Sequence, residues 1–345
     1  MSSDQIGVLT TTQLGVLRST QVPAFTTAQV AAITTTQMAS LNSRVLSSLT
    51  TDQIANGLTT DQVQSLTTVG LGALTSVQVG ALTTAEVASL TTVQVAGLSS
   101  RAVAALTTDQ IANGLSTTQL QALTSTELNS LTTIQVSTGL TTVEMSALTT
   151  TQLSGLNSRV LQALTTDQLA NGLSTTQVAA LTSSALNGLT TVQVSTGLST
   201  TQIGALSTTQ LAGLSTRTVQ ALTTDQIANG LTTTQIAGLS TATIAALTTD
   251  QIANGLTTVQ LQAMTTVELA GLTTRQIAQG LTTTEVAALT TSQVAGLKTS
   301  AVAALTTDQL ANGLTTVQLQ AMTTVELGAL SSVQAAALTT GEVGA

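Results

Sequence analysis

Residues 164–172 read Leu-Thr-Thr-Asp-Gln-Leu-Ala-Asn-Gly, and variants of this short pattern fill the whole chain. Counted from Met1, the 345 residues divide without remainder into 42 repeats, of which 33 have eight residues and nine have a ninth that is always glycine. A repeat this short is one small fragment that can bury its apolar side only against its neighbours. The sequence therefore predicts one continuous repeat array over residues 1–345, with no separate globular domain.

The start of each repeat carries two signals for the beginning of a helix. With the leucine as position 1, positions 2 to 5 are usually Thr-Thr-x-Gln, which matches the capping box. Positions 1 and 6 are aliphatic in almost every repeat, as the hydrophobic staple requires. In this register Thr165 is an N-cap with Gln168 at N3, and Thr223 and Gln226 have the same roles in their repeat. We therefore predict one short helix per repeat.

Such helices cannot be stable alone. About six helical residues span roughly 9 Å, and nucleation costs more free energy than so few hydrogen bonds return. We therefore expect an all-α solenoid, a superhelical coil with positions 1 and 6 inside and the small position 8 at close contacts. Positions 3, 4 and 7 are then outside. A β-solenoid is the alternative, because Thr, Val and Ile favour strands.

The glycines that end the longer repeats predict where the chain turns most sharply. Glycine can adopt the positive φ of a helix C′ cap without steric cost. The spacings between these repeats alternate between 25 and 33 residues over much of the chain, which corresponds to about 3.5 repeats per turn if each glycine marks an equivalent corner. The predicted caps include Gly57, Gly114, Gly172, Gly230, Gly255 and Gly313.

Charges follow the same longer period. Four arginines occupy position 4 of a repeat, and an aspartate occupies position 4 of the next one. One interpretation is an ion pair between consecutive repeats, and the other is two solvated charges, since exposed pairs contribute only about 0–1 kcal/mol. The candidate pairs are Arg44 with Asp52, Arg101 with Asp109, Arg159 with Asp167, and Arg217 with Asp225.

One stretch departs from the pattern. Pro23 falls at position 7, where it lacks the amide that a helix needs and clashes with the preceding turn. Arg18 replaces the capping threonine of the same repeat. We therefore expect an irregular segment at residues 17–25.

The composition argues against catalysis and against a bound cofactor. The chain has no His and no Cys and only one Lys, whereas acid–base and nucleophilic catalysis rely mainly on those residues or on tuned carboxylates. Transition metals would need His or Cys ligands. The Asp-Gln-Ile-Ala-Asn-Gly segments lack the ligand spacing of a calcium loop. The 15 acidic residues recur at equivalent outer positions without an insertion that could form a pocket. We expect neither an enzyme nor a cofactor.

Charge and hydropathy exclude two classes of partner. A net charge of −8 with only seven scattered basic residues does not suit a run of phosphates, so we expect no nucleic acid. Apolar runs end after about five residues, far below the roughly 20 of a spanning helix, so we expect no membrane insertion. Residues 1–4 show no basic region followed by an apolar one, so no conventional signal peptide is visible.

The threonines suggest a further alternative. If position 2 caps the helix, position-3 threonines such as Thr224, Thr233 and Thr249 would face solvent in regular rows. Rows of this kind resemble those of ice-binding proteins. The simpler interpretation is that the threonine pairs are helix caps and soluble spacers.

Two further resemblances concern the repeat itself. Leu-Thr-x-x-Gln-Val-x-Ala is similar to the first helix of the repeats in bacterial transcription activator-like effectors, but the base-reading loop and the basic balance are absent. The whole chain resembles the low-complexity LTTxQVxA arrays of very large bacterial surface or secreted proteins that are described as adhesin-like. That resemblance implies a stalk, fibre or scaffold outside the cell or at the bacterial surface, with an unidentified surface ligand. It leaves open whether copies associate end to end.

Overall fold

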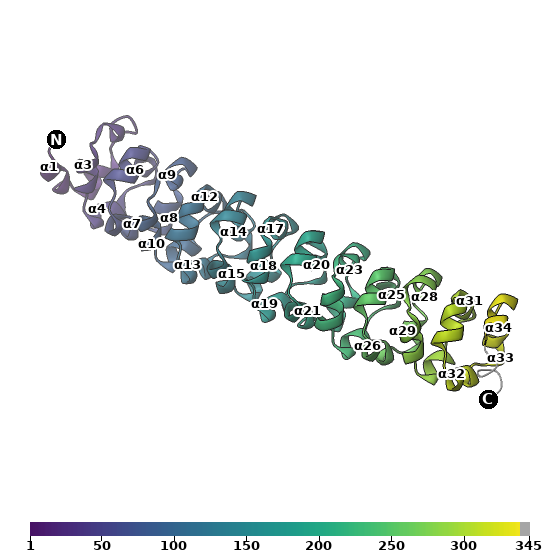
Figure 1. Cartoon of the computed structure of the whole chain (residues 1–345). Coiled ribbons are helices and arrows are strands. Elements are labelled where there is room, and N and C mark those ends of the chain that lie inside the picture. The colour runs from purple at the N-terminus through teal and green to yellow at the C-terminus, as the bar shows by residue number, and fades with distance from the viewer. Residues whose placement is uncertain (339–345) are drawn as a thin grey trace. The chain divides into compact units, whose positions relative to one another are not determined.

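A computed structural model describes residues 1–338 of the chain, and these residues form short helices with no β-strand among them. Almost every repeat contributes one helix, and Figure 1 shows the helices following one another in a coil. The prediction of an all-α solenoid is confirmed, and the β-solenoid alternative is wrong. The chain forms two compact segments, an N-terminal one at Met1–Leu173 and a C-terminal one at Ser174–Ala345.

The helices of the N-terminal segment include one 3-10 helix, η1, and two π-helical stretches, η2 and η3. In chain order they are α1 (Ser3–Gly7), α2 (Thr11–Gly15), η1 (Val22–Ala24), α3 (Thr27–Ala31), α4 (Thr35–Ser40), α5 (Ser43–Leu46), α6 (Thr51–Gly57), α7 (Thr60–Ser65), α8 (Thr68–Gly72), α9 (Ser76–Ala81), α10 (Thr84–Ser89), α11 (Thr92–Ala96), α12 (Ser100–Ala105), η2 (Gln110–Gly114), α13 (Thr117–Ala122), α14 (Ser125–Leu128), η3 (Gln135–Gly139), α15 (Thr142–Ala147), α16 (Thr150–Ser154), α17 (Ser158–Ala163) and α18 (Thr166–Ala170).

The C-terminal segment repeats the same design and includes four π-helical stretches, η4 to η7. Its helices are α19 (Thr175–Ala179), α20 (Ser183–Gly188), η4 (Gln193–Gly197), α21 (Thr200–Gly204), α22 (Thr208–Ala212), α23 (Thr216–Ala221), η5 (Gln226–Gly230), α24 (Thr233–Ile236), α25 (Thr241–Ala246), η6 (Gln251–Gly255), α26 (Thr258–Ala263), α27 (Thr266–Leu269), α28 (Thr274–Gly280), α29 (Thr283–Ala288), α30 (Thr291–Val294), α31 (Thr299–Ala304), η7 (Gln309–Gly313), α32 (Thr316–Ala321), α33 (Thr324–Leu327) and α34 (Ser332–Ala337).

The capping box starts these helices. The Thr165 hydroxyl accepts from the Gln168 amide at 3.1 Å, and Gln168 Oε1 accepts from the Thr165 amide at 2.7 Å. Thr223 and Gln226 make the same two bonds at 3.0 and 2.8 Å. Where the capping box is present, two of the four orphan amides at the helix start are thus satisfied within the repeat.

The core runs along the inside of the coil and is built from positions 1 and 6. Leu164 is 4% exposed and Leu169 is fully buried, and the same two positions supply most of the buried aliphatic side chains in both segments. Helices three repeats apart pack on each other, as α6, α9 and α12 do in the N-terminal segment. Burial of two large aliphatic side chains per repeat gives each turn its cohesion with the next.

The predicted role of the extra glycines is wrong. No described glycine has a positive φ, so Gly57, Gly114, Gly172, Gly230, Gly255 and Gly313 are not left-handed caps. Most of the nine-residue repeats instead absorb the extra residue by widening the helix into a π-turn. The amide of Leu115, for example, donates to the carbonyl of Gln110 five residues earlier, at 3.0 Å.

Glycine is required there by packing. A Cβ at Gly114 would lie 3.2 Å from Val87 Cβ and 3.3 Å from the Thr84 carbonyl oxygen, one turn earlier in the coil. A Cβ at Gly57 would meet Thr27 and Val30 just as closely. The glycine therefore lets the wider π-turn lie against the helix of the preceding turn.

The repeat at 17–24 has no α-helix. Its residues form only the 3-10 helix η1, with Pro23 in its first turn and no side-chain cap. Gln21 Oε1 still accepts from the Arg18 amide at 2.8 Å, so half of the capping box persists without a threonine.

This packing predicts opposite effects of alanine at two glycines. Gly114→Ala should destabilise the protein by about 1–3 kcal/mol, because its Cβ crowds Val87 and backbone. Gly72→Ala is the matched control, since a Cβ there meets nothing within 4 Å, and it should stabilise by about 0.4–1 kcal/mol. Urea unfolding followed by circular dichroism measures both. A neutral Gly114→Ala would show that packing does not select the glycine.

Candidate functional site

The feature that repeats most faithfully in the structure is the side chain at position 5. The sequence pattern predicts only a capping role for this side chain, but it is buried nearly as deeply as the core leucines. Gln62 is 2% exposed and Gln152 is 4% exposed. A buried amide needs partners for both its oxygen and its nitrogen. The oxygen is used by the capping box of its own repeat.

The nitrogen reaches the preceding turn of the coil. Gln152 Nε2 donates to the carbonyl oxygens of Leu120 at 2.9 Å and Leu123 at 2.7 Å. In the C-terminal segment, Gln251 Nε2 donates to Val219 at 2.8 Å and Leu222 at 2.6 Å. We call this set of bonds, from position-5 glutamines to carbonyls 28 to 33 residues earlier, the glutamine ladder.

The ladder has a clear structural purpose. The last carbonyls of a helix have no partner within it, and in helices this short they are a large share of the backbone. Each glutamine therefore completes two helices, the start of its own and the end of an earlier one. Its acceptors lie in the third and fourth repeats before it, which agrees with about 3.5 repeats per turn.

Where position 5 is not Gln or Glu, a basic side chain often replaces the ladder bond. Arg159 is followed by Val160, and its guanidinium donates to the carbonyls of Leu131, at 2.6 Å, and Asn129. These carbonyls lie at repeat positions that the ladder also uses, positions 1 and 7. Three further basic residues do the same, namely Arg44 to Gly15, Arg217 to Asn187 and Leu189, and Lys298 to Ala270.

Three of the four arginines of the candidate Arg–Asp pairs make these backbone bonds in place of the ion pair. The aspartates bond within their own helix, where Asn56 Nδ2 donates to Asp52 Oδ1 at 2.8 Å. The same bond joins Asn113 to Asp109, Asn171 to Asp167 and Asn229 to Asp225. Consecutive repeats point about a third of a turn apart, so the same outer position in two of them faces different directions. Arg101 lies beside Gly72 and Leu74, the corresponding residues of the preceding turn.

The predicted rows of solvent-facing threonine are interrupted. Thr233 is exposed, but Thr224 and Thr249 are half-buried. The reason is that position 3 lies under the small residue that ends a later repeat. A Cβ at Gly255 would lie 3.3 Å from the Cα of Thr224. Position 3 is therefore a stacking position in many repeats and not a free outer surface.

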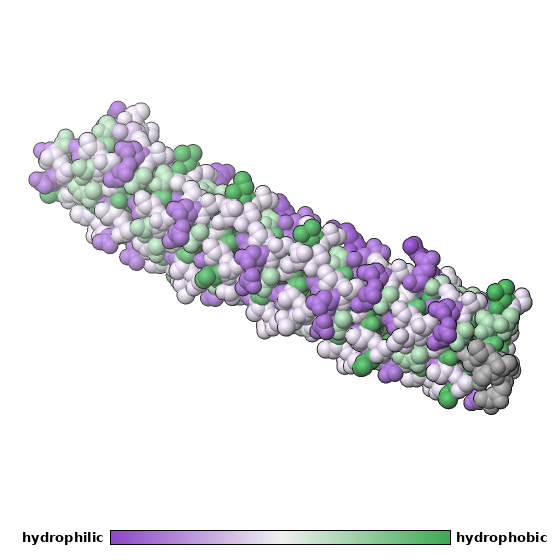
Figure 2. All heavy atoms as spheres, viewed as in Figure 1, coloured by the Kyte–Doolittle hydropathy of each residue, from purple (hydrophilic) through white to green (hydrophobic). Residues whose placement is uncertain are grey.

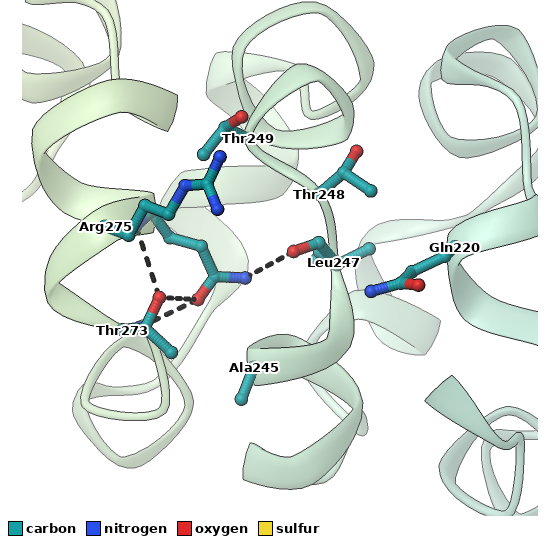
Figure 3. A pocket seen from close by; sticks show the side chains of 8 residues that line it. Gln220, Ala245, Leu247, Thr248, Thr249, Thr273 and Arg275 are labelled. Carbon is teal, nitrogen blue, oxygen red and sulfur yellow. Dashed lines mark hydrogen bonds between the residues drawn. The ribbon is translucent and has the colours of Figure 1, made fainter. Parts of the chain in front are cut away.

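Open depressions lie beside several arginines of the described chain. One of about 280 Å³ is lined by Arg275, Thr248, Thr249 and Gln220, among others. Figure 3 shows Arg275 close to Thr249, and a ladder bond of 2.7 Å joins Gln276 Nε2 to the Leu247 carbonyl beside them. Because Gln276 supplies the ladder bond, Arg275 bonds instead to Gln279.

The remaining surface features concern metal-binding groups, membrane spans and exposed apolar side chains. Among residues 1–338, no group of three or more acidic side chains is placed to hold a metal ion. No helix in that range is long and apolar enough to cross a membrane. Position-4 aliphatic side chains such as Val77 and Ile134 are exposed, and Figure 2 shows the apolar groups of the visible face as separate spots.

Comparison with known proteins finds a similar repeat family. The family model described as the ALTTAQ repeat matches residues 30–68 and 196–229, one stretch in each segment. These matches support a tandem repeat array with a structural character. No curated protein sequence matches the chain.

The glutamine ladder predicts that losing a single side-chain amide nitrogen lowers the stability of the protein. Gln62→Glu preserves the capping box but loses the donor that bonds Val30 at 2.9 Å, so it should cost about 1–3 kcal/mol at neutral pH. Gln13→Glu is the matched control, because Gln13 is exposed and its hydrogen bonds stay within its own repeat. If both variants lose the same free energy of unfolding in urea, the loss comes from the helix cap and not from the ladder bond.

The ladder bonds that arginine makes in place of glutamine lead to a separate prediction. Arg159→Ala leaves the Asn129 and Leu131 carbonyls without their donor, and should cost about 1–3 kcal/mol. Adding Val160→Gln should recover most of the loss by restoring the usual ladder residue. Arg275→Ala should change stability by only a few tenths, because Gln276 makes the ladder bond there. Thermal unfolding measures all three, and failure of Val160→Gln to rescue would refute the equivalence.

Proposed function

We propose that the chain is a structural repeat module without catalytic activity, which serves as a scaffold or spacer with an adhesive role. The observation that carries the proposal is the glutamine ladder. It ties each turn to the previous one by the same buried bonds throughout both segments. A scaffold needs this kind of repeated connection, since each turn gains stability only from its neighbours.

The chemistry of the exposed residues fits the same role. The few basic side chains mostly bond to backbone of the preceding turn, and the aspartates bond to asparagines in their own helices. The depressions are open and lined by arginine, threonine and small residues. These groups do not form the paired acid and base, or nucleophile and base, that catalysis uses.

The adhesive role and the location outside the cell rest on the resemblance to LTTxQVxA arrays of bacterial surface proteins. A regular surface of Thr, Ser and single aliphatic side chains offers many weak, equivalent contacts. Such contacts gain strength by multivalency. The partner is a surface ligand or other copies of this chain, and end-to-end association stays part of the proposal. No specific observation favours ice binding, because the position-3 rows are interrupted.

A display experiment tests the adhesive role. The chain is anchored on a bacterium that does not adhere, and attachment to glass and to neighbouring cells is measured under flow. Cells displaying the intact chain should attach several times more than cells displaying a version with the same composition but shuffled repeats. Equal attachment would refute adhesion. Retained helicity of the intact chain, measured after release, would leave the scaffold role standing.

A further inference from the structure

Six glutamates of the described chain occupy the ladder position, and each lacks the amide nitrogen that donates to the preceding turn. Glu86 and Glu285 are the two in which one carboxyl oxygen is buried without a partner. Glu86 Oε2 accepts from the Thr83 amide at 2.6 Å, and Glu285 Oε2 accepts from the Thr282 amide at 2.7 Å. Both side chains are almost fully buried, at 3% and 4% exposed. The second oxygen, Oε1, is buried in both residues and has no hydrogen-bond partner within the described chain.

The repeat shows what surrounds this oxygen. In the equivalent repeats, Gln226 Nε2 donates to Val194 and Leu198, and Gln260 Nε2 donates to Ile227 and Leu231. The same positions relative to Glu86 are Ile54 and Leu58, and those relative to Glu285 are Ile252 and Leu256. A carboxylate therefore places an oxygen, which cannot donate, at the position from which a glutamine amide donates to these carbonyl oxygens.

We propose that Glu86 and Glu285 are proton-binding sites, and that protonation turns each into a ladder donor. The proton on Oε1 then bonds to a carbonyl of the preceding turn, as the glutamine amide does elsewhere. Loss of the proton breaks that bond and leaves a buried anion beside carbonyl dipoles, which loosens the contact between the two turns. The site thus couples the stacking of the coil to pH.

On the described helices that pack against these two glutamates, no basic side chain balances the charge. Helix α10, which carries Glu86, packs on α7 and η2, whose nearby charges are the exposed carboxylates Asp61 and Asp109. Helix α29, which carries Glu285, packs on α26, which has no charged residue, and on η7, preceded by Asp308. The η6 turn is preceded by Asp250, and α6 carries Asp52.

The glycine-ended repeats enclose these two sites. Gly114 lies against Val87, the neighbour of Glu86, and Gly313 lies against Val286, the neighbour of Glu285. Added Cβ atoms would come within 3.2 and 3.1 Å of the valine Cβ atoms. This close approach keeps water from the carboxyl groups. Burial accordingly raises the pKa of Glu86 and Glu285 above 4.5, although bonds from the Thr83 and Thr282 amides and hydroxyls lower it in part.

The sign of the effect on stability follows from linkage. Because the folded-state pKa is above the unfolded value, the folded chain holds these protons more tightly. The contribution to stability is complete below pH 4.5 and is lost as the pH rises through the raised folded-state pKa. The pH dependence of these two ladder contacts does not depend on the surface to which the protein attaches.

The test compares the full chain with the double variant Glu86→Gln/Glu285→Gln between about pH 4 and pH 8, a range that spans the ordinary and raised carboxyl pKa. The variant carries permanent ladder donors. Its melting temperature should exceed that of the natural chain by about 2–4 °C at the alkaline end, and the difference should vanish at the acid end. Difference infrared spectra between the acid and alkaline ends should show the band of a buried protonated carboxyl group that the variant lacks.

Glu127→Gln is the matched control, because Glu127 occupies the same repeat position but is only half-buried. It should give no pH-dependent difference. A difference between the natural chain and the double variant that is the same at every pH would overturn the proposal. So would recovery of the alkaline loss by NaCl or KCl but not by choline chloride, since a metal cation would then be the ligand.

Discussion

The structure depends on one side-chain amide that is shared between two helices. Helices of four to seven residues leave most of their backbone groups at an end, where no internal partner exists. The position-5 glutamine satisfies an amide at the start of its own helix with its oxygen and carbonyls at the end of an earlier helix with its nitrogen. Local capping and coil stacking are therefore one interaction, and neither is complete without the other.

This arrangement explains how so polar a residue is tolerated in the core. A buried primary amide costs free energy unless its hydrogen bonds are made. Gln152 makes them with Thr149 on one side and with Leu120 and Leu123 on the other. The aliphatic side chains at positions 1 and 6 exclude water around these bonds, which strengthens them. The hydrophobic core and the ladder thus support each other along the coil.

The chain has few charged residues, and four of its basic side chains donate hydrogen bonds to backbone carbonyls. Where a repeat has Val160 or Ala301 in place of glutamine, Arg159 or Lys298 donates to carbonyls of the preceding turn. A cation near helix C-termini is favourable, so the replacement preserves both the bond and the electrostatics. An ionised glutamate at the same position preserves only the cap. The ladder position is therefore where substitutions change the cohesion of the coil most directly, in either direction.

The sequence by itself determined the repeat, the helical class, the cap at Thr165 and the buried leucines, because these follow from local spacing and hydrophobic period. It also indicated about 3.5 repeats per turn, through the glycine spacing. Only the tertiary structure decided which groups meet across turns. The bonds from Gln152 to Leu123, the replacement by Arg159, and the packing of Gly114 on Val87 join residues 27 to 30 positions apart. No local pattern encodes the rotation between repeats that brings such residues together. The predicted ion pairs, glycine caps and threonine rows therefore differ from what the structure shows.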